Sequence, residues 1–194
     1  MCNDSQLDNT IAVFCIARIP CDVRLINYSP TKRAHLTSTQ LLNEFFIEAF
    51  KAPELKAVES VLVDTTDTTK LTSPTRAPVQ QNLSYPFLDW KLDDLVKFVW
   101  QFDRSEHGIM NTEFVIMDKQ TLEDKTVVLV TPPEFHDDIE TAPRLTARSD
   151  FRSSLITLNV KSMGVGGDEP WEKAAVENGS VIRLYDDDKS SGDS

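Results

Sequence analysis

Short apolar runs, separated by polar segments, are the first feature of this chain. Four of them are rich in β-branched and aromatic residues and are predicted to be strands: residues 11–18, 58–64, 114–117 and 126–130. The last two are apolar without alternation, which is the pattern of strands covered on both faces. Two further strands are predicted from the apolar runs LITLNV, residues 155–160, and VIRLY, residues 181–185.

Two other segments repeat their apolar residues at helical spacing. The first, residues 37–50, has capping-box spacing between Thr37 and Gln40 and an apolar face that consists of Leu41, Leu42, Phe45, Phe46 and Ala49. The second is predicted to open at Asp89, with an apolar side made of Leu92, Leu95, Val96, Val99 and Phe102. A short third helix is predicted after Asp168, with Gly179 as its stop.

The order of these segments predicts the fold class. Strand, helix, strand, helix, strand in the first half indicates parallel crossovers, and the strands that follow indicate an antiparallel addition. We therefore predict an α/β fold, with α+β as the alternative: a mixed, partly parallel sheet with two to three flanking helices in a single domain, residues 1–185. Residues 65–86, rich in Thr, Ser and Pro, are predicted to be a loop that adds little to the core, and residues 186–194 a disordered acidic tail.

Charge narrows the choice of partners. The formal net charge is -11 and the pI is about 4.7, which disfavours nucleic acid and anionic membrane surfaces. A protein partner or a neutral or basic small molecule fits this charge better. The chain shows neither a signal-like start nor a long apolar span, and its cysteine number is odd, so we predict a soluble cytoplasmic protein. The sequence indicates no particular cofactor and leaves the oligomeric state open.

Several of these segments resemble a small microbial family of domains of unassigned function. The resemblance is carried by VLVD at 61–64, by LDWKLDDLVKF at 88–98, and by FVIM followed by Asp118, a Thr-containing turn and TVVLV. It covers most of the chain, although the segment after Asp64 is longer here than in that family. The resemblance supports the fold and implies no chemistry.

Two predicted strands end in aspartate, at Asp64 and Asp118. Ligands of open sheets with parallel crossovers tend to lie beyond the carboxyl ends of the strands, so these carboxylates could share a proton or bind a divalent ion. His136, in the acidic run EFHDDIE, could add a general base. The alternative is that Asp118 only begins a turn by hydrogen-bonding to nearby backbone.

Known catalytic motifs do not match these residues. The residues after Asp118 lack the second carboxylate and the Thr of an aspartyl-nucleophile phosphatase, and they lack the oxygen ligands of a calcium loop. The glycines of SMGVGG match neither of the two glycine-rich phosphate-binding motifs, G-x-x-x-x-G-K-[ST] and G-x-G-x-x-G. Cys15 lies within an apolar run and is predicted to be a core residue. We therefore predict no metal site of established type.

Aromatic residues gather around the second helix. Trp90, Phe98 and Trp100 are the candidates for a surface that binds a partner or a flat apolar ligand, with core packing as the alternative. Because each catalytic pattern lacks a required member, the leading hypothesis is a soluble binding module without catalysis. The alternative is a small hydrolase or isomerase that uses acid/base or metal chemistry at Asp64, Asp118 and His136.

Overall fold

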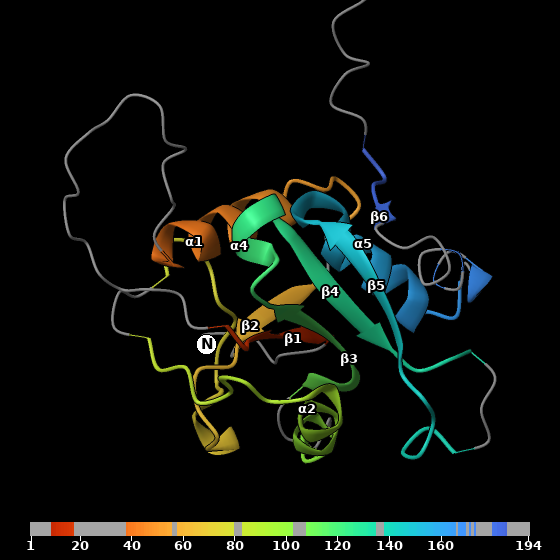
Figure 1. Cartoon of the computed structure of the whole chain (residues 1–194), viewed down its shortest axis with the longest axis horizontal. Helices are drawn as coiled ribbons and strands as arrows, with labels where there is room; N and C mark the ends of the chain where they lie inside the picture. The colour runs from red at the N-terminus through yellow and green to blue at the C-terminus, as the bar shows by residue number, and fades with distance from the viewer. Residues whose placement is uncertain are drawn as a thin grey trace, which may run out of the picture.

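One mixed sheet joins the strands of this protein (Figure 1). The computed structural model describes residues 9–17, 38–55, 58–79, 83–102, 108–134, 138–165, 167–169, 171, 173 and 180–185. The strands are β1 (Thr10–Cys15), β2 (Glu59–Leu62), β3 (Ile109–Met117), β4 (Thr126–Thr131), β5 (Leu145–Asp150) and β6 (Val181–Ile182). They form a six-stranded sheet in the order β2-β1-β3-β4-β5-β6.

The strand directions follow the prediction for the first half of the chain. β1 pairs in parallel with β2 on one side and with β3 on the other. β4 is antiparallel to both β3 and β5, and β6 runs parallel to β5. The predicted mixed, partly parallel sheet is confirmed.

Helices lie on both faces of this sheet. In Figure 1, α1 (Ser38–Ala49) and α5 (Phe151–Ser162) lie on one face and α2 (Leu92–Val99) on the other. Two short helical turns complete the described elements, η1 (Thr68–Lys70) before α2 and α4 (Thr121–Asp124) between β3 and β4.

Alternation along β1 divides the core into two layers. Ile11 and Val13 face the layer of α1 and α5, whereas Ala12 and Phe14 face the layer of α2. All four side chains are fully buried. At about 25 cal/mol per Å² of apolar surface removed from water, these two layers supply the main stabilisation of the fold.

The start of α2 differs from the prediction. The helix begins at Leu92, with Lys91 as its N-terminal cap, and not at Asp89. Asp89 instead has a φ of 60° and lies in a turn, where the short side chain of aspartate tolerates the left-handed conformation. Its backbone N–H donates to the carbonyl oxygen of Ile16 at 3.0 Å, which fastens this turn to the end of β1.

Residues 155–160, predicted to be a strand, belong to α5, and that prediction is wrong. Asp150 caps the helix by accepting a hydrogen bond from the N–H of Ser153 at 2.8 Å. Phe151, Leu155 and Leu158 then fall on one helical face at spacings of four and three residues, and all three are buried in the layer shared with α1. The β-branched residues of this segment favour a strand locally, but packing against α1 makes the helix the more stable structure.

β5 is a strand that the hydrophobic pattern does not predict, because residues 134–150 are polar and read as irregular. The residues of β5 alternate only weakly in hydrophobicity, since Ala147 and Ser149 are small and buried on one face while the partly buried Arg148 lies on the other. The strand is held by a register of six pairs with β4.

The Thr/Ser/Pro-rich segment contributes more to the core than the sequence predicts. Leu71 and Val79 are both buried, one in each apolar layer. Asn43 of α1 accepts a hydrogen bond from the N–H of Val79 at 2.6 Å. Residues 80–82 and the predicted tail, 186–194, lie outside the described residues.

Within the described ranges, no helix has the length and apolar character needed to cross a membrane.

The third predicted helix is described only in part. Glu169, Trp171 and Lys173 are helical there. Trp171 is buried in the layer of α1 and α5.

A buried ion pair fastens the end of α5 to the chain that follows it. Lys161, whose side chain is 5% exposed, pairs with Asp168 and also donates to the carbonyl oxygen of Gly167 at 3.1 Å. The carboxylate of Asp168 accepts from the backbone N–H of Glu134 at 3.1 and 3.2 Å. Burial by itself would raise the pKa of Asp168, but the hydrogen bonds from Lys161 and Glu134 and the charge of Lys161 hold that pKa below its usual value.

We expect Asp168→Ala to lower the free energy of unfolding by about 2 to 4 kcal/mol, because it leaves the Lys161 ammonium buried without its counter-charge. Urea unfolding measures the loss. Glu169→Ala is the matched control, since Glu169 is exposed and should change stability little. Because the pKa of Asp168 is depressed, its contribution is present above the unfolded pKa of about 4 and is lost as the pH falls through the folded pKa. Equal loss in the two variants would contradict this role.

Candidate functional site

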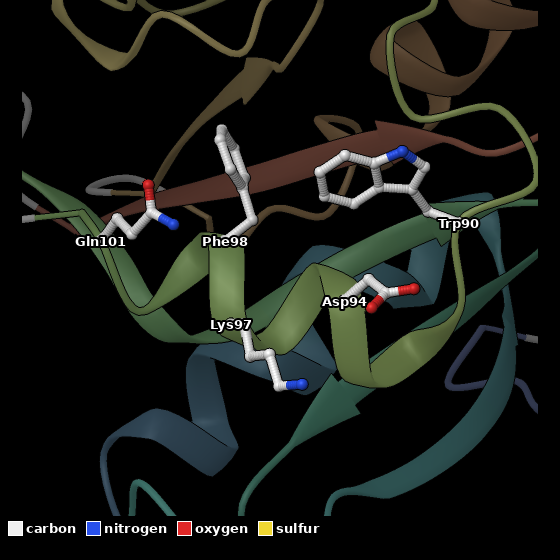
Figure 2. Close-up of a pocket in the computed structure, with 5 residues that line it drawn as sticks. All are labelled: Trp90, Asp94, Lys97, Phe98 and Gln101. Carbon is white, nitrogen blue, oxygen red and sulfur yellow. The ribbon is translucent and has the colours of Figure 1, made fainter.

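A hollow beside α2 contains two of the residues that the sequence predicts for a site. It has a volume of about 270 Å³ and is lined by Trp90, Asp94, Lys97, Phe98 and Gln101 (Figure 2). Two of the three predicted aromatic residues, Trp90 and Phe98, therefore lie together in it. Trp100, the third, is the C-terminal cap of α2 and does not line this hollow.

The lining residues come together because of helical spacing. Asp94 and Phe98 are four residues apart and lie on one flank of α2, and Gln101, in the turn after the helix, lies three residues further on. Trp90 precedes the helix and reaches the same flank. In Figure 2 the ring of Phe98 rises from α2 on the side where the indole of Trp90 lies, while Lys97 points the opposite way.

An aromatic cluster holds the floor of the hollow in place. The ring of Trp90 packs edge to face on Phe87 at 5.0 Å and on Phe98 at 6.0 Å between centroids. Phe98 is 5% exposed and also contacts Phe14 of β1 and Phe102. Because these contacts join Trp90 to the sheet, its indole is presented at the surface in a defined orientation.

The rim of the hollow carries polar groups of different charge. Asp94 supplies a carboxylate, Lys97 an ammonium and Gln101 an amide, and all three are exposed. The N–H of Lys91 donates to Asp94 at 3.4 Å. Asp94 and Lys97 therefore bring opposite charges to the rim of the same hollow.

Asp118, the predicted strand-end carboxylate, forms a turn. It accepts from the backbone N–H of Thr121 at 3.0 Å and from the hydroxyl of Thr121 at 3.1 Å, and its own N–H donates to that hydroxyl at 3.0 Å. Its second oxygen pairs with Arg148 of β5, which also donates to the hydroxyl of Thr126 at 2.9 Å. These partners occupy both carboxylate oxygens of Asp118.

Asp64 and Asp118 lie at the same end of the sheet but are not neighbours. β1 runs between the strands that lead to them, so their backbones are about 10 Å apart, or two strand spacings. Among the described residues, Asp64 takes part in no hydrogen bond or ion pair, and no group of three or more His, Cys, Asp or Glu side chains is placed to bind a metal. His136 lies outside the described residues.

Cys15 is a core residue, as predicted. It is 3% exposed within the layer of α1 and α5, and burial raises the pKa of its thiol to about 12. The thiolate needed for nucleophilic attack is therefore scarce at neutral pH.

Comparison with known proteins adds no relative. No protein-family model matches the chain, and neither a curated protein nor a solved structure matches it. The resemblance to a family of domains of unassigned function therefore stays a prediction, and the interpretation of the site rests on its geometry.

Sequence reasoning missed three residues of the hollow, Asp94, Lys97 and Gln101. A signal for them was present, because a polar stripe at positions 94, 97 and 101 follows Trp90 at helical spacing. What the sequence could not supply is the direction in which Trp90 turns, since this depends on the left-handed turn at Asp89.

We expect Asp118→Asn to lower the free energy of unfolding by about 1 to 3 kcal/mol, because the charge that pairs with Arg148 is lost and the turn to Thr121 is weakened. Chemical denaturation measures the difference. Asp64→Asn is the matched control and should leave stability nearly unchanged. If Asp64→Asn instead destabilised the protein as much as Asp118→Asn, the contrast drawn between the two strand ends would be incorrect.

Proposed function

We propose that this chain is a cytoplasmic binding module without catalysis, whose hollow beside α2 holds one side chain of a protein partner. The observation that carries the proposal is the presence of Trp90 and Phe98 in the floor of a surface hollow, with a carboxylate at its rim. Aromatic residues that reach the surface at a concave site are typical anchors of binding interfaces.

The volume of the hollow is sufficient for one side chain of a partner. Pockets that enclose drug-sized ligands have about 300 to 1,000 Å³, whereas this one has about 270 Å³. A flat apolar group, such as an aromatic ring or the stem of a basic side chain, would cover the indole of Trp90.

Charge supports a neutral or basic occupant. Asp94 and Lys97 both line the hollow and carry opposite charges, whereas the whole chain carries a net charge of -11, which favours a neutral or basic occupant. A cation over the indole face would gain about 0.5 to 2 kcal/mol from the ring, and the carboxylate would add to that attraction.

The arrangement of Asp64 and Asp118 supports the enzymatic alternative less well than the hollow supports binding. Asp118 is held by Thr121 and Arg148, and Asp64 lies across β1 from it. Acid/base or metal chemistry shared by these two carboxylates would need a rearrangement of the turn at Asp118.

Titration with small probes tests the proposal even while the partner is unidentified. In NMR spectra of the ¹⁵N-labelled full chain, indole and benzamidine should each shift the side-chain N–H signal of Trp90 and leave that of the buried Trp171 in place. Gln101→Trp, which fills the hollow from its exposed rim, should abolish both shifts, whereas Asp93→Asn, outside the hollow, should not.

Asp94→Asn separates shape from charge at the same hollow. The variant should lower the affinity for benzamidine several-fold and leave the affinity for indole unchanged, because only benzamidine carries a positive charge. If neither probe shifted Trp90, or if Gln101→Trp left the shifts intact, the hollow would not be a binding site and the proposal would fall.

A further inference from the structure

A second surface, at the outer edge of β2, presents a serine followed by a proline, with a basic residue two positions after that proline. The segment reads Ser73, Pro74, Thr75, Arg76, and the same pattern recurs as SPTK at residues 29–32. Kinases that are directed by proline phosphorylate a hydroxyl residue that directly precedes proline, and many favour a basic residue two positions beyond that proline. From the pattern and its setting, we infer that Ser73 is a phosphorylation site for a kinase of this class.

Ser73 is exposed on a segment that is anchored on both sides by buried or hydrogen-bonded residues. Ser73 is exposed, whereas Leu71, two residues earlier, is buried in the α2 layer. Two residues later, the N–H of Thr75 donates to the carbonyl oxygen of Ser60 at 2.7 Å, and its hydroxyl accepts from the N–H of Leu62 at 2.8 Å. The segment therefore lies along the edge of β2 with Ser73 facing solvent between two anchors.

Arg76 supplies the basic residue and is accessible to a kinase. Its guanidinium pairs with Glu59 and lies 4.3 Å above the ring centroid of Phe50. The Arg76 and Glu59 side chains are 50% and 35% exposed. Ion pairs exposed to this degree contribute only about 0.2 to 1 kcal/mol, so an acidic group of a kinase can displace Glu59.

The transfer itself requires only the hydroxyl and ATP. The Ser73 oxygen attacks the γ-phosphorus of ATP, and the bond from that phosphorus to the β,γ-bridging oxygen breaks. ADP leaves, and a carboxylate of the kinase takes the hydroxyl proton. Pro74 has no N–H, so the position after the target serine offers no backbone donor.

Phosphorylation would place a dianion three residues from Arg76. Arginine forms bidentate hydrogen bonds to phosphate, and these are stronger than its exposed pair with a carboxylate. The phosphate would therefore draw Arg76 away from Glu59. Ser73, Arg76 and Glu59 do not line the hollow beside α2, so this inference does not rest on the function proposed for that hollow.

Phosphorylation of the folded full chain tests the inference. A Ser29→Ala chain, which removes the second copy of the pattern, is incubated with ATP and a purified proline-directed kinase and followed by mass spectrometry. We expect one phosphate per chain, located on Ser73. Ser73→Ala or Pro74→Ala in that background should abolish incorporation, whereas Thr72→Ala, a neighbouring hydroxyl without a following proline, should not.

Two further variants test the role of Arg76. In the same background, Arg76→Gln should lower the kcat/KM of phosphorylation several-fold, and Glu59→Gln should raise it because it frees Arg76. Circular dichroism confirms that the variants are folded. Absence of phosphate on the folded Ser29→Ala chain, with modification only after denaturation, would overturn the inference, as would incorporation that survives Ser73→Ala.

Discussion

Burial of β1 on both of its faces is the constraint on which the rest of this structure depends. Its apolar residues point in alternation to opposite sides, so the strand is stable only if each side of the sheet is covered. The chain meets this requirement with α1 and α5 on one face and α2 on the other. The crossovers that place α1 and α2 on opposite faces also set β2 and β3 on opposite sides of β1.

The polar groups at the ends of the elements secure this arrangement. Asp118 follows β3, forms the turn into α4 and reaches Arg148 of β5, so one side chain links two strands and the helical turn between β3 and β4. Lys161 and Asp168 do the same at the end of α5, where the pair joins the helix to the chain after β4. In both places an acidic side chain near a strand or helix end has a structural use that a search for catalytic residues would overlook.

The hollow beside α2 follows from how that helix covers its face. The core takes the side of α2 centred on Leu95 and Val99, which are fully buried. Phe98 lies at the border of that side, so its ring belongs to the core and yet lines the surface hollow. Trp90 completes the floor because the turn at Asp89 is fastened to the end of β1. The proposed binding of one side chain would cost little conformational entropy at a hollow built on a helix flank and an anchored turn.

By itself the sequence determined the apolar strands β1 to β4, the amphipathic helices α1 and α2, the mixed sheet, and the gathering of aromatic residues near α2. These features follow from local periodicity, which a single chain segment carries in full. Tertiary structure decided that residues 155–160 are helical, because their apolar face packs on α1. It also decided that Asp118 lies beside Arg148 and not beside Asp64, and that Trp90 meets Phe98 while Trp100 does not line the hollow. Each of these outcomes depends on contacts between residues distant in the chain or on the direction of a turn, and neither is encoded in the spacing of hydrophobic residues.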